Sequence, residues 1–181
     1  DGVNISSTRG LSSLQRNYGD DGRSEVILDG AGNVYVASST QSSNFPVTAG
    51  VFQGAWGGGN NNQDGVVLKL NANLSTLLFA SYLGGSGNDA AYVLSLGPTG
   101  DIYVAGGTES SNFPFPGSQV GTVGPANHGN ASTSLIDGFV ARISNSGNTL
   151  IKSTYIGTSG IDQVFGIQFD NLGFPYIMGQ T

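Results

Sequence analysis

One phrase occurs twice in this chain, and it constrains the fold more than any other feature. The copies span residues 32–47 and 100–115, and ten of their 16 positions are identical at an offset of 68. A shorter and more divergent third copy covers residues 173–181. Self-similarity at a fixed period predicts a repeat architecture, so a residue that recurs in each copy is first suspected of building the fold.

The repeat extends beyond this phrase and predicts four short strands per copy. Residues 64–70 and 77–87 match residues 137–143 and 150–160 at an offset of 73. Several of these segments alternate apolar and polar residues, as half-buried strands do. The predicted strands are 23–29, 33–39, 65–70 and 76–83 in the first copy, 91–96, 101–107, 138–143 and 149–156 in the second, and 163–170 and 174–179 in the third. Gly and Asn at 29–33, 98–101, 71–73 and 144–148 predict tight turns between them.

Four short antiparallel strands in each repeat predict an all-β fold of β-propeller-like blades. The expected units are an N-terminal segment (1–18), two complete blades (19–87 and 88–160) and a partial blade (161–181). Residues 9–14 are a candidate degenerate fourth strand, and the N-terminal segment is a candidate donated strand. Closed propellers have about four or more blades, so we expect this chain to remain open.

Composition excludes several classes of function. The net charge is −6 with only six Lys and Arg residues, so the basic footprint of a nucleic-acid-binding protein is missing. No apolar stretch is long enough for a transmembrane helix, and the absence of Cys excludes disulfides and thiolate metal sites. A chain that begins with Asp rather than Met, and is rich in Gly, Ser and Asn, suggests a processed product at the cell surface or outside the cell.

The motifs together resemble the SBBP family of β-propeller repeats. The matching residues are Asp89–Ala91, 100–106, Thr108, 111–114, 137–142 and 153–157 of the second copy, with 45–53 and 81–87 of the first. The likeness covers about residues 19–181, although Pro175 replaces the Val or Ile of the other copies and predicts an edge strand. Such repeats occur in large secreted or surface-anchored bacterial proteins. The resemblance therefore implies an architecture and a location, and it implies no catalytic activity.

Recurring aspartates are the candidate metal ligands. They are Asp21, Asp89 and Asp162 near the start of each copy, and Asp64 and Asp137 at the third strands. Calcium binds through several oxygen donors, and blade-to-blade loops could bring these carboxylates together. The simpler interpretation is that each Asp caps a turn by accepting backbone N–H groups.

No catalytic or cofactor-binding residue is predicted, and calcium is the single cofactor considered. A glycosidase needs two carboxylates, and the acids that do not recur are Glu25 and Glu109, both readily explained as surface residues. The lone histidine, His128, lies in a Gly/Asn-rich insert and is a weak metal or base signal. No G-x-S-x-G motif supports a serine hydrolase.

Two kinds of surface residue could meet carbohydrate. Trp56 is a candidate sugar-stacking platform, although an aromatic side chain at such a position more often covers a blade edge. Asn4, Asn73 and Asn130 match the N-glycosylation pattern, which arises readily by chance in a chain rich in Asn and Ser.

These observations predict a non-enzymatic extracellular structural or adhesive protein that assembles head to tail with other copies of itself. Phe174, Tyr176 and Met178 on the last predicted strand are the expected assembly edge, because native proteins rarely leave an edge strand bare. Adding a strand across chains would complete the open blade. The alternative is a module that binds surface glycans or proteins and is a piece of a larger closed propeller.

Overall fold

The computed structural model describes residues 24–58, 63–115, 136–158 and 160–181. The all-β prediction is confirmed, since this part of the chain forms ten strands and no helix. The strands are β1 (Glu25–Leu28), β2 (Val34–Thr40), β3 (Asp64–Leu70), β4 (Leu77–Leu83), β5 (Asp89–Leu96), β6 (Ile102–Thr108), β7 (Asp137–Ile143), β8 (Leu150–Ile156), β9 (Gln163–Phe169) and β10 (Pro175–Gln180). The predicted segments at 9–14 and 1–18 lie outside the described residues.

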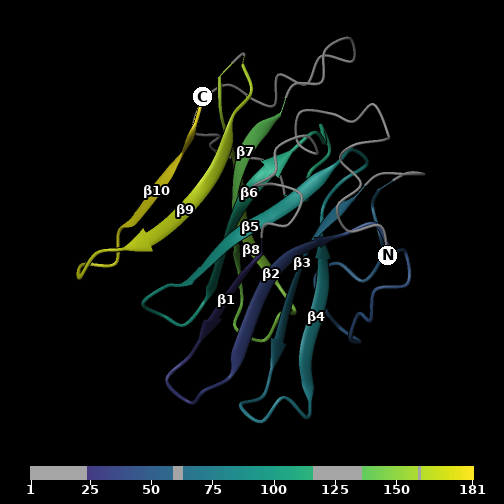
Figure 1. Cartoon of the computed structure of the whole chain (residues 1–181), viewed down its shortest axis with the longest axis vertical. Coiled ribbons are helices and arrows are strands. Elements are labelled where there is room, and N and C mark those ends of the chain that lie inside the picture. Colours follow the sequence, from purple (N-terminus) through teal and green to yellow (C-terminus); the bar gives the residue numbers. More distant parts are fainter. Residues whose placement is uncertain (1–23, 59–62, 116–135, 159) are drawn as a thin grey trace.

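The strands form three antiparallel sheets in chain order (Figure 1). Sheet 1 contains β1 to β4, sheet 2 contains β5 to β8, and sheet 3 contains β9 and β10. Within each sheet, strands that are consecutive in the chain pair with each other, so each sheet is a simple meander. These sheets match the expected four-strand repeats, and within the described residues they do not close into a barrel.

The predicted strands differ from the observed ones mainly at their ends. Each third strand begins at the aspartate that the prediction left outside, because Asp64 pairs with Thr40 and Asp137 pairs with Thr108. Asp64, Asp89 and Asp137 are therefore the first residues of their strands, whereas Asp162 directly precedes β9.

The first hairpin turn of every sheet has one geometry. In sheet 1 the Asp29 N–H donates to Asn33 O at 3.0 Å, and the Gly32 N–H donates to Asp29 O at 2.9 Å. The turns at 97–101 and 170–174 repeat both bonds. Gly32, Gly100 and Gly173 have φ angles of +79°, +82° and +86°, a region that favours glycine. This requirement explains why the turn glycine recurs.

A tyrosine of the fourth strand holds the Ser-Ser-Asn-Phe-Pro loop of the repeated phrase. In sheet 2 the Tyr155 hydroxyl donates to Ser110 O at 2.7 Å and accepts the Phe113 N–H at 3.3 Å. In sheet 1 the Tyr82 hydroxyl makes the same two bonds, at 2.8 and 3.1 Å. The phrase recurs because it builds the fold.

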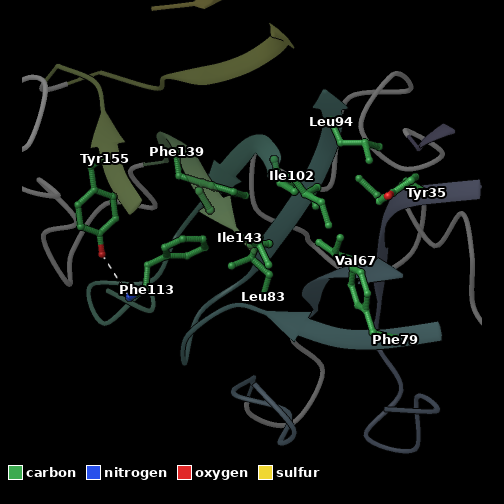
Figure 2. Packing of buried hydrophobic residues seen from close by; sticks show 14 residues of the cluster. Tyr35, Val67, Phe79, Leu83, Leu94, Ile102, Phe113, Phe139, Ile143 and Tyr155 are labelled. Carbon is green, nitrogen blue, oxygen red and sulfur yellow. Dashed lines mark hydrogen bonds between the residues drawn. The ribbon is translucent and has the colours of Figure 1, made fainter. Parts of the chain in front are cut away.

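The sheets pack face to face around two apolar clusters. The larger cluster lies between sheets 1 and 2, with Leu94 of β5 pointing toward Tyr35 of β2 (Figure 2). The smaller one lies between sheets 2 and 3 and contains Ile167 of β9. Gly65 and Gly138 allow close approach at these seams, since a Cβ on either glycine would lie 3.1 Å or less from a side chain of the next sheet.

Candidate functional site

Each seam between sheets contains a pair of buried carboxylates beside a glycine. A Cβ on Gly84 would lie 2.7 Å from Asp64 Oδ1 and 2.9 Å from Asp89 Oδ2. A Cβ on the equivalent Gly157 would meet the second pair, formed by Asp137 Oδ1 and Asp162 Oδ2, at the same two distances. The structure therefore brings together four of the five aspartates that the sequence singled out, two per seam. Asp21 lies outside the described residues.

Hydrogen-bond donors surround these carboxylates. Asp89 accepts bonds from Thr108 Oγ1, from Ser110 Oγ at 2.7 Å and from the Gly85 N–H at 2.7 Å. Asp64 Oδ2 accepts the Gly57 N–H at 2.8 Å, whereas its buried Oδ1 has no hydrogen-bond partner among the described residues. Through these bonds, Asp64 and Asp89 hold the neighbouring loops and the end of β6 in place.

Burial shifts the protonation of the first pair. Desolvation, with a smaller contribution from the charge of Asp89, raises the pKa of Asp64 to about 7. Desolvation also raises the pKa of Asp89 to about 6, against the lowering effect of the Thr108 hydrogen bond. Two neighbouring buried carboxylates disfavour a second negative charge, so this seam can hold a proton near neutral pH.

A calcium site at this pair would need more oxygen ligands than the two carboxylates supply. Calcium takes about six to eight oxygen ligands. Over the described ranges, no three Asp, Glu or His side chains lie together in a group that could hold a metal ion. The hydroxyl groups of Thr108 and Ser110 donate hydrogen bonds to Asp89, and calcium binding at this pair stays a prediction.

The two non-recurring glutamates connect neighbouring segments. Glu25 Oε2 on β1 accepts the Leu94 N–H of β5 at 2.5 Å, across the seam. Glu109 Oε2, just after β6, accepts a bond from Asn88 Nδ2 at 2.6 Å. Both carboxylates therefore support the packing of strands and loops.

The two described residues that could meet carbohydrate, Trp56 and Asn73, differ in their exposure to solvent. Trp56 is only partly exposed, and its indole N–H is buried without an acceptor among the described residues. Its ring packs against Gly58, where a Cβ would lie 2.8 Å from the indole nitrogen. Asn73 is exposed in the turn between β3 and β4 and accepts a bond from Ser75 Oγ at 2.6 Å. Asn4, Asn130 and His128 lie outside the described residues.

The predicted assembly edge is exposed. Phe174, Tyr176 and Met178 have 62%, 62% and 69% of their surface accessible, and every residue of β10 is exposed. Sequence reasoning missed a second exposed apolar pair, Val26 and Leu28 on β1, with 59% and 63% accessible. The signal was present in the repeat, because these positions align with core residues of β5.

A scan against protein-family models finds no matching family, and a search of curated proteins finds no match. The likeness to SBBP repeats therefore stays a prediction. Among the described residues, no helix has the length and apolar character needed to cross a membrane.

Proposed function

We propose that this chain is a non-enzymatic, extracellular structural or adhesive repeat protein that assembles head to tail with other copies of itself. The observation that carries the proposal is the open state of sheet 3. In sheets 1 and 2 the second strand pairs with a third strand, as in the pairs Thr40–Asp64 and Thr108–Asp137. The equivalent strand β10 pairs only with β9 within the described part of the chain.

An edge of this kind favours pairing with another chain. An exposed strand presents unpaired N–H and C=O groups, and native proteins usually cover or charge such an edge. β10 carries no charged residue along Pro175–Gln180, and its apolar side chains are exposed. Addition of a strand from a second copy would supply backbone hydrogen bonds and bury these side chains together.

The remaining chemistry supports a structural role. The recurring turn glycines, tyrosines and aspartates each hold a turn, a loop or a seam, and the two unique glutamates accept hydrogen bonds from neighbouring segments. The low charge and the Gly-, Ser- and Asn-rich composition suit a surface protein outside the cell. A contact between unlike surfaces extends into a filament unless its rotation closes a ring.

The test is the particle mass of the whole chain at rising concentration, measured by light scattering and followed by electron microscopy. We expect oligomers that grow with concentration. Met178→Lys places a charge on the exposed edge and should reduce assembly, whereas Leu74→Lys charges an equally exposed apolar residue in the β3–β4 turn and should not. Monomers at every concentration would refute the proposal.

A further inference from the structure

The two internal seams are built in the same way. β5 lies mainly against β2, and β9 lies mainly against β6, so the first strand of a sheet covers the second strand of the sheet before it. We call the covering side of a sheet its leading face, marked on β5 by Leu94 and Leu96. We call the covered side its receiving face, marked on β2 by Tyr35 and Ala37.

The leading face of sheet 1 is apolar, and no sheet of the described residues covers it. Leu94 aligns with Ile167 at an offset of 73 and with Val26 at an offset of 68. Leu94 and Ile167 are 1% and 2% exposed, whereas Val26 is 59% exposed. Leu96, which packs against the larger cluster, aligns with Leu28, which is 63% exposed.

The other positions of this face show the same contrast. Four residues of sheet 2 are fully buried against sheet 1, and their equivalents in sheet 1 are only partly buried. The pairs are Ile102 and Val34, Val104 and Val36, Ala141 and Leu68, and Ile143 and Leu70. Sheet 1 therefore has the residues of a leading face, and none of the described strands lies beneath them.

The receiving face of sheet 3 is the matching surface. Tyr35, Tyr103 and Tyr176 occupy one repeat position. At the first seam, Tyr35 is fully buried. At the second seam, Tyr103 packs edge-on against Phe169, with 4.8 Å between the two ring centroids. Tyr176 is 62% exposed, and Met178 beside it, at the repeat position of Ala37, is 69% exposed.

We infer that the leading face of sheet 1 in one copy packs on the receiving face of sheet 3 in a second copy, in the register of the internal seams. Among the three described sheets, one face of each kind has no partner sheet, and each has the residues that its equivalents use at the internal seams. The contact places Leu28 of one copy against Tyr176 of the next, because their equivalents Phe169 and Tyr103 touch. This inference rests on the proposed function, and it adds a contact between two sheet faces to the strand addition at the β10 edge.

The chemistry of the two faces favours a copy of this chain as the occupant. Val26, Leu28, Tyr176 and Met178 carry no charge, so the contact between them is apolar. The charged neighbour on the receiving side is Asp170, which accepts a hydrogen bond from the Tyr176 hydroxyl at 3.3 Å. Each copy carries a net charge of −6, and salt screens the repulsion between copies. Assembly should therefore strengthen as salt is added, because an apolar contact does not weaken with ionic strength.

Cysteine cross-linking tests the register in the full chain, which has no native cysteine. A Leu28→Cys chain is mixed with a Tyr176→Cys chain under mild oxidation, with Met178→Cys as a second acceptor variant. The matched control is Leu78→Cys, which lies on the same face at 46% exposure. Its equivalent Ile151 stays 39% exposed although sheet 2 is covered, so position 78 should remain outside the contact. Unfolding curves first establish that each variant folds like the parent chain.

We expect the parent protein to form oligomers. We also expect Leu28→Cys to form a disulfide with either acceptor variant at least about tenfold faster than Leu78→Cys does, which corresponds to about 1.4 kcal/mol of preference for the proposed register. Oligomers without this preference would overturn the face-to-face register and leave the proposed assembly intact. Monomeric parent protein at every concentration and salt would overturn both.

Discussion

Replacing Asp64 by Asn should remove a large part of the pH dependence of folding. The Asp64 carboxyl has an ordinary pKa of 3.8, and burial beside Asp89 raises the pKa to about 7 in the folded chain. Because the folded pKa is raised, its contribution to stability is complete below pH 3.8 and is lost as the pH rises through 7. The parent protein should therefore be less stable at mildly alkaline pH than at mildly acidic pH.

The magnitude follows from the linkage between proton binding and folding. One pKa unit corresponds to about 1.4 kcal/mol, so the full displacement corresponds to at most about 4 kcal/mol. Between about pH 5 and about pH 8 only part of this difference is expressed, and the effective dielectric of a protein reduces it further, which leaves about 2 kcal/mol. For a chain of this length that is roughly 4–8 °C in Tm.

Asn at position 64 keeps an oxygen for the Gly57 N–H and carries no charge. The variant should gain stability at about pH 8 and should lose most of the difference between about pH 5 and about pH 8. Urea unfolding can be followed by the fluorescence of Trp56, the single tryptophan, which precedes Gly57.

Asp101→Asn is the control, because the contribution of Asp101 to stability has the opposite dependence on pH. The guanidinium of Arg142 lowers the pKa of Asp101, so the stability from this carboxylate is present at neutral pH and is lost as the pH falls. A parent protein equally stable at both pH values would refute the reasoning, as would an Asp64→Asn variant that loses the same stability at both.

Three further substitutions test how the repeat is built, each by urea unfolding. Gly106→Ala should lower the free energy of unfolding by about 3 kcal/mol or more, because the new Cβ would overlap the carbonyl oxygen of Ala90. The control Gly30→Ala places its Cβ where no atom lies within 4 Å and should change stability little. Equal losses of stability in the two variants would contradict the close approach at Gly106. Tyr155→Phe should cost about 1–3 kcal/mol by leaving the buried groups of the Ser-Ser-Asn-Phe-Pro loop unpaired, and an unchanged midpoint would argue against the clamp. Gly100→Ala should cost about 1 kcal/mol because its φ is +82°, and Gly100→Asn should cost less.

The sequence by itself determined the strands, the turns and the order of the sheets. Alternating side chains and positive-φ glycines act within a few residues of the chain, so their pattern predicts local structure directly. The repeat then predicted four antiparallel strands for each of the first two copies and two strands for the third. Its main error was small: Asp64 and Asp137 begin the third strands, because they pair with threonines of the preceding strand.

Only the tertiary structure decided which residues meet across a seam. Asp64 and Asp89 come from different sheets, and nothing in their spacing reveals that they lie beside the same glycine. Exposure was decided in the same way, since Val26 and Leu94 hold one repeat position and, of the described sheets, one packs against Leu94 and none against Val26. Burial and pKa depend on the neighbours that packing supplies, and equivalent residues of a repeated sequence have different neighbours at its two ends.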